Sequence, residues 1–96
     1  MSARFTVRAE LDIASIALDL SARTPAAGLE FFRRMDEALD LLDRLPRLGV
    51  LRPDLGQHTR VLLVDARWLF VYDVVQDEAQ VARVVPAATD LRRITI

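Results

Sequence analysis

The stretch that decides the fold is WLFVYDVVQDEAQVARVV, residues 68–85. It holds two runs rich in β-branched and aromatic residues, 68–75 and 80–85, with a short polar turn at 76–79 between them. This pattern predicts a β-hairpin. Successive side chains of a strand point to opposite faces. One face of the first strand therefore carries Trp68, Phe70, Tyr72 and Val74, and the other carries Leu69, Val71, Asp73 and Val75.

A third strand precedes this hairpin. It is predicted at residues 60–64, which are apolar after Arg60, and the polar turn 65–67 joins it to the hairpin, so the three strands are expected to form an antiparallel meander. Pro86 lacks the N–H that a strand ladder needs, and we expect the sheet to end there. Residues 89–94 are expected to form a last helical turn or two.

Two amphipathic helices are predicted upstream of the meander, after a short strand at residues 5–8. In ELDIASIALDLSAR, residues 10–23, an apolar line recurs at the spacing of one helical face. Thr24 and Pro25 form a start signal for the second helix, which we expect to run to about Leu45. The expected apolar lines are Ile13, Ile16, Ala17 and Leu20 in the first helix and Leu29, Phe32, Met35, Leu39 and Leu42 in the second.

The element order predicts an α+β fold, with an N-terminal strand and a helical hairpin packed on an antiparallel sheet in a single domain, 1–96. The segment 44–58 is punctuated by proline and glycine and is expected to be a loop. Two helices can cover only one face of a sheet whose two faces are both apolar. The other face is covered either by this loop, through Leu48, Val50, Leu51 and Leu55, or by a partner chain.

Composition excludes several classes of function. The chain has 96 residues and no cysteine, which rules out disulfides, thiol nucleophiles and cysteine zinc sites. Its single histidine, His58, argues against a histidine metal cluster, and no cofactor is expected. All 13 basic residues are arginine, so there is no lysine base, and the net charge of −1 argues against direct nucleic-acid binding.

No run of apolar residues has the length of a membrane span, and the N-terminus, MSARFTVRAELD, is charged where a signal peptide would be apolar. The expected location is therefore the cytoplasm.

Several strings resemble the ParE branch of the RelE/ParE toxin superfamily. They are LDIASIALDL, TPAAGLEFFRRMDEALDLL, LDRLPRLGVLRPDLGQHTRVLLV and the hairpin quoted above, and the resemblance runs from about Val7 to Ile94. It implies the toxin component of a type II toxin–antitoxin system, a non-catalytic inhibitor of DNA gyrase. It also implies a hetero-oligomer with a ParD-like antitoxin, whose C-terminal segment would place a helix beside the helical hairpin and an extended part along the sheet.

The chain departs from this family at RVVPAATDL, residues 83–91. Pro86 replaces the usual histidine, Ala87 a glycine and Thr89 an arginine, so an attenuated module that binds antitoxin without toxicity is one alternative. A ribosome-dependent mRNA endonuclease, similar to RelE, is another. The resemblance implies that such an RNase uses basic residues and a C-terminal tyrosine, whereas Tyr72 is expected inside a strand and arginine is a poor base.

Six residues are candidates for contact with the antitoxin or the target, and no residue is predicted to be catalytic. Arg83 is expected either to pair with an acidic residue such as Asp73 or to receive a partner's carboxylate. Trp68 is expected to be a core or interface anchor, and His58 an exposed loop residue. The six candidates are Arg60, Trp68, Arg83, Asp90, Arg92 and Arg93.

Overall fold

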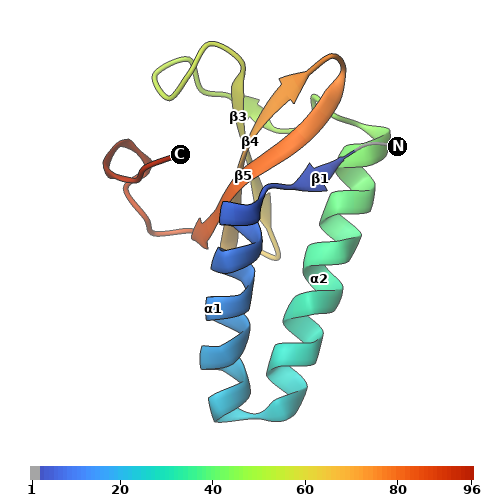
Figure 1. The fold of residues 1–96 in the computed structure, drawn as a ribbon, viewed down its shortest axis with the longest axis vertical. Helices are drawn as coiled ribbons and strands as arrows, with labels where there is room; N and C mark the ends of the chain where they lie inside the picture. The colour runs from blue at the N-terminus through green and yellow to red at the C-terminus, as the bar shows by residue number, and fades with distance from the viewer. Residues whose placement is uncertain (1–2) are drawn as a thin grey trace.

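A helical hairpin packs on one face of a five-stranded sheet in the computed structural model, which describes residues 3–96 (Figure 1). The closed end of the hairpin projects beyond the sheet. The helices are α1 (Val7–Arg23) and α2 (Pro25–Arg44). The strands are β1 (Arg4–Phe5), β2 (Val50–Leu51), β3 (Thr59–Val64), β4 (Trp68–Val75) and β5 (Glu78–Pro86), and a 3₁₀ helix, η1 (Leu91–Arg93), follows them.

The sheet has the order β1-β5-β4-β3-β2. The predicted meander is confirmed, since β3, β4 and β5 pair antiparallel and β5 ends at Pro86. The sheet as a whole is mixed, because β1 pairs with β5 in parallel, with Arg4 opposite Gln80. The predicted loop 44–58 contains one short strand, β2, which pairs with Val61 and Arg60 at the other edge.

The predicted strand at residues 5–8 is wrong beyond Phe5. Thr6 instead caps α1, since its hydroxyl accepts a hydrogen bond from the Ala9 N–H at 3.2 Å. The Thr6 N–H donates to the Val81 carbonyl at 2.9 Å. A threonine that satisfies a free N–H of the first turn favours a helix start over a longer strand.

Thr24 joins the helices as predicted. It ends α1, and its hydroxyl caps α2 by accepting from the Ala27 N–H at 3.2 Å, while Pro25 opens the second helix. Gly28 is buried at the contact between the helices. A Cβ there would collide with the Ser21 hydroxyl and lie 3.3 Å from the Ala17 carbonyl. Glycine therefore permits the close approach of α1 and α2 near their connection.

The predicted apolar face of α2 is only partly right. Met35 and Leu42 are buried and Leu39 is half-buried, but Leu29 and Phe32 are 72% and 46% exposed. A line built mainly from three-residue steps drifts around a helix that has 3.6 residues per turn. The residues that α2 buries are Gly28, Phe31, Met35, Ala38 and Leu42.

Each face of the sheet has its own apolar cluster, as the alternation in β4 predicted. Phe70 and Tyr72 lie under the helices, and Val71 lies on the opposite face together with Val85 and Leu91. The chain itself covers part of this second face, with Leu55 from the loop and Ile94 from the C-terminal segment. The other loop residues predicted to cover it, Leu48, Val50 and Leu51, are exposed.

Candidate functional site

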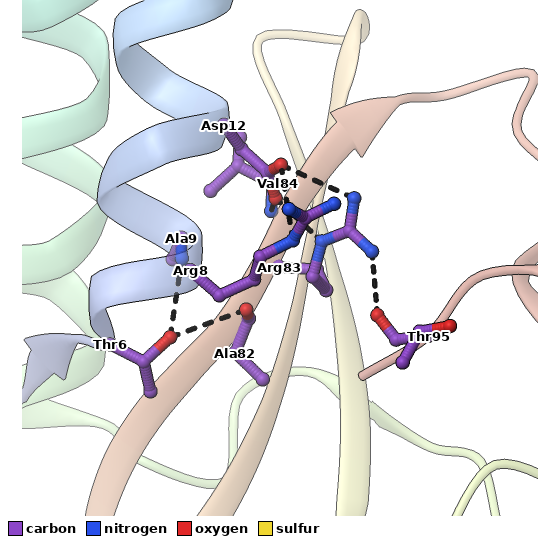
Figure 2. A network of polar contacts seen from close by, with 8 residues as sticks. All are labelled: Thr6, Arg8, Ala9, Asp12, Ala82, Arg83, Val84 and Thr95. Carbon is purple, nitrogen blue, oxygen red and sulfur yellow. Dashed lines mark hydrogen bonds and ion pairs between the residues drawn. The ribbon is translucent and has the colours of Figure 1, made fainter.

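The side chain of Arg83 is bound by two other parts of the protein, α1 and the C-terminal segment (Figure 2). Its guanidinium donates to both carboxylate oxygens of Asp12 on α1, at 2.7 Å and 3.2 Å, and to the Thr95 carbonyl at 2.6 Å. The predicted pairing with Asp73 is wrong. Asp73 instead accepts a hydrogen bond from the Thr59 hydroxyl at 2.8 Å. Helix α1 lies beside β5 and so brings Asp12, from far away in the sequence, to Arg83.

The same network covers the edge of β5 beyond its short pairing with β1. Asp12 accepts a hydrogen bond from the Val84 N–H at 2.9 Å, and the Thr6 hydroxyl donates to the Ala82 carbonyl at 3.3 Å. Figure 2 shows these groups between α1 and β5. Backbone groups at this edge thus find partners on α1 and on its N-cap residue, and Arg83 also fastens the C-terminal segment to the sheet.

Two further candidates make contacts within the chain. Arg60 donates to the carbonyls of Arg47 and Gly49, at 3.1 Å and 2.8 Å. Trp68 meets Phe31 of α2 edge to face, with ring centroids 5.1 Å apart, and the Arg67 guanidinium lies 5.4 Å from the tryptophan ring. Trp68 therefore anchors the contact between sheet and helix while it stays partly exposed.

The C-terminal candidates lie together beside the second face of the sheet. Asp90 caps η1 by accepting from the Arg92 N–H at 3.2 Å, and it is 3.5 Å from the Arg92 guanidinium and 3.4 Å from that of Arg93. Arg52 and Asp54 line the same shallow hollow and are joined by two hydrogen bonds. The hydrogen bonds from Arg52 lower the pKa of Asp54. Each of these arginines thus has a carboxylate beside it.

His58 is exposed in a loop, as predicted. Tyr72 is fully buried, and its hydroxyl accepts a hydrogen bond from the Gly49 N–H at 2.7 Å. Burial raises the pKa of this hydroxyl. In residues 3–96, no three His, Asp or Glu side chains come together in a way that could hold a metal ion. Within the same residues, no helix is both long enough and apolar enough to cross a membrane.

An apolar stripe that was not predicted from the sequence lies on the outer face of α1. Val7, Leu11 and Leu18 are 73%, 58% and 72% exposed. Their spacing of four and seven residues, with Ala14 between them, places them on one line opposite the buried face of the helix. We call Val7, Leu11, Ala14 and Leu18 the outer stripe. Its signal was present in the sequence, as a second apolar line beside the one that forms the core.

The free edge of β3 was also missed. Strand β2 pairs only with Arg60 and Val61, and on the side of β3 away from β4 no strand of the described residues lies beside 62–64. Alternation along an antiparallel pair directs the backbone groups of Leu63 away from β4. A hollow beside this edge is lined by Arg34, Glu37, Ala38 and Leu41 of α2 and by Leu62, Leu63, Val64 and Asp65.

Comparisons with known proteins identify a family through one family model and a shared fold through a solved structure. The family model described as "ParE toxin of type II toxin-antitoxin system, parDE" matches residues 3–91. A search of curated proteins finds no match. Among solved structures, a chain of the chromosomal ParDE system from P. aeruginosa is similar, with a TM-score of 0.75 and 22% sequence identity. The match covers 90% of this chain and 95% of that one, and at this identity it shows a shared fold.

Proposed function

The chain belongs to the family of ParE toxins of type II toxin–antitoxin systems, and we propose that it arrests bacterial growth by binding DNA gyrase, without catalysing a reaction. We also propose that a ParD-like antitoxin neutralises it by covering the helical hairpin and the free edge of the sheet. Membership of the family supports the choice of target and the class of antitoxin in this proposal. The exposed surfaces of the chain support the proposed mode of binding.

The outer stripe is the observation that carries the antitoxin proposal. A helix of a small protein rarely leaves three large aliphatic side chains in line and more than half exposed, because burying each of them is worth about 1.5–3 kcal/mol. An amphipathic helix of a partner would lie along this line with its own apolar residues at the same spacing. Leu29 and Phe32 of α2 extend the exposed apolar surface near the closed end of the hairpin.

The charge on α2 indicates what else the antitoxin helix would carry. Asp36 and Asp40 are exposed and continue the line of Leu29 along the outer face of α2, at spacings of seven and four residues. A helix docked on the hairpin would therefore be favoured by basic side chains beside its apolar face. Salt would then weaken its association with the toxin.

The free edge of β3 suits the extended part of the antitoxin. The unpaired backbone groups of Leu63 can accept an added strand, and the hollow between α2 and β3 offers Ala38, Leu41 and Leu62 to its side chains. Leu63 itself is 56% exposed. An antitoxin strand would therefore gain main-chain hydrogen bonds along β3 and apolar contacts against α2.

The contacts of the polar candidates support a binding function over an RNase function. The guanidinium of Arg83 donates its hydrogen bonds to Asp12 and Thr95, and the guanidinium of Arg60 donates to loop carbonyls. The hydroxyl of Tyr72 is buried. An endonuclease needs groups that reach a ribose hydroxyl and a phosphate. Arg92 and Arg93 are the most exposed of the six candidates, and their role in target contact stays a prediction.

Inducible expression in a bacterial host, alone and with the neighbouring antitoxin gene, tests the proposed function. We expect growth arrest and filamentation that the antitoxin relieves, and loss of supercoiling by purified gyrase when the toxin is added. Cleavage of mRNA with unaffected gyrase would favour the RelE-like alternative. Normal growth with a stable protein that binds antitoxin would favour the attenuated module.

The mode of antitoxin binding has its own test. Replacing Leu11 and Leu18 by glutamate places charges in the outer stripe and should weaken antitoxin binding by at least about a hundredfold, because each change removes a central apolar contact. The matched control is Val75→Glu, an exposed apolar residue of β4 away from the helices. Equal affinity of both variants, measured by calorimetry, would reject the outer stripe as the antitoxin site.

A further inference from the structure

The loop between α2 and β2, residues 45–49, exposes apolar side chains although its backbone is tightly held. Leu45 and Leu48 are 52% and 44% exposed, and Val50, which follows the loop, is 70% exposed. A surface hollow is lined by Arg44, Leu45, Pro46, Arg47 and Leu48. Figure 1 shows this region at the end of the molecule opposite the closed end of the hairpin. We call Leu45, Leu48 and Val50, with Arg44, the loop surface.

Side chains of the sheet form hydrogen bonds with the backbone of this loop. Gly49 donates its N–H to the Tyr72 hydroxyl at 2.7 Å, and Arg60 donates to the carbonyls of Arg47 and Gly49. A Cβ at Gly49 would lie 2.6 Å from the Tyr72 oxygen and 2.9 Å from the Val61 carbonyl, so only glycine fits this contact. The Arg47 side chain is tied to Asp77 of the β4–β5 turn at 2.7 Å.

This anchoring explains why the leucines stay exposed. A flexible loop could turn two leucines inward, whereas here the backbone is fixed at both Arg47 and Gly49. The conformational entropy that binding would otherwise cost is therefore lost already on folding. A preorganised apolar surface of this kind binds a partner with little further ordering.

The loop surface and the outer face of α2 differ in charge, so they favour different partners. Within residues 3–96, Arg44 makes no ion pair, and Arg60 is bonded to carbonyls alone and not to a carboxylate. The positive charge beside the leucines favours an acidic partner. The outer face of α2, with Asp36 and Asp40, favours a basic one.

We propose that the loop surface is where this toxin contacts its protein target, and that the target presents apolar side chains flanked by carboxylates. This inference rests on the proposed function, because it requires a protein target, but it does not require that the target be gyrase. Toxin and antitoxin would then meet on the helices and at the β3 edge, while the target meets the opposite end of the molecule.

The test compares loop variants with stripe variants in the full chain. In the double variant Leu45→Glu/Leu48→Glu, and separately in Arg44→Glu, we expect unchanged thermal unfolding and unchanged affinity for the antitoxin. The concentration that inhibits gyrase supercoiling should rise by about tenfold or more, because a charge replaces a central apolar contact or reverses the favourable one. The matched control, Leu11→Glu/Leu18→Glu, should inhibit gyrase like the unmodified toxin and lose antitoxin binding.

Each outcome decides between the proposals. Loop variants that inhibit gyrase like the unmodified toxin would overturn the inference, as would loop variants that lose antitoxin affinity. If the unmodified toxin arrests growth but leaves gyrase active, the gyrase proposal fails, and relief of growth arrest in the loop variants still decides the inference. If the unmodified toxin affects neither growth nor gyrase, both proposals fall.

Discussion

At the scale of single residues, Arg83 shows how the tertiary context sets a role. In the sequence it is a charged residue between apolar neighbours, which could serve either a partner or the fold. Its side chain is only 10% exposed, and it joins α1, β5 and the C-terminal segment through Asp12 and Thr95. A buried ion pair contributes little net stability, but the loss of one member leaves the other charge without a partner.

We therefore expect Arg83→Met to lower the free energy of unfolding by about 3 kcal/mol, because Asp12 would lose its closest ion-pair partner in a largely buried site. Arg93→Met is the matched control. Its side chain is 86% exposed, and the change should stay within about 0.5 kcal/mol. Urea denaturation measures both. A stable Arg83→Met protein with weakened partner binding would show that Arg83 serves an interface instead of the fold.

At the scale of elements, the two turns of the meander carry backbone conformations that most residues avoid. Asp65 and Ala66 in the β3–β4 turn both have φ of 55°, and Gln76 and Asp77 in the β4–β5 turn have φ of 52° and 65°. These left-handed pairs match the right-handed twist of a hairpin, for which glycine or asparagine is usual. The polar turns were visible in the sequence, but their strain was not.

Ala66→Gly should stabilise the chain by about 0.5–1 kcal/mol. Glycine removes the steric cost of the left-handed conformation, which exceeds the entropy it adds to the unfolded state. Ala14→Gly, in the exposed middle of α1, gives the opposite sign as a control, with a loss of about 1 kcal/mol. Thermal unfolding of the two variants measures the difference. Destabilisation by both would mean that the turn is not strained.

At the scale of the whole molecule, the two faces of the sheet are covered to different extents. The helices cover the centre of one face, where Phe70 and Tyr72 are buried, and the other face depends on a thin cover in which Leu91 is the buried residue of the C-terminal segment. Arg83 and Leu91 hold this segment in place by different means, a hydrogen bond to Thr95 and apolar contact with the cluster of Val71 and Val85.

Leu91→Ala should therefore cost about 2–3 kcal/mol and increase the binding of an apolar dye, because the second cluster loses its cover. Ile96→Ala removes a side chain that is 49% exposed and should change the stability much less. Equal effects of the two changes in urea denaturation would show that the C-terminal segment does not stabilise the second face.

Local signals in the sequence determined the order of the elements, the meander and the helix connection. Thr24 and Pro25 act within one turn of the chain, and the alternation in β4 needs no distant partner. For the same reason the outer stripe could have been found from the spacing of Val7, Leu11 and Leu18 alone.

Only the tertiary structure decided the rest. Asp12 meets Arg83 because α1 lies beside the edge of β5, and Gly49 meets Tyr72 because the sheet folds back under the loop. Strand β1 pairs in parallel with β5, which lies at the far end of the sequence, and the edge of β3 stays free beyond Val61 because β2 is only two residues long. These features depend on contacts between residues far apart in the chain, and the pattern around each residue does not specify which distant group it will meet.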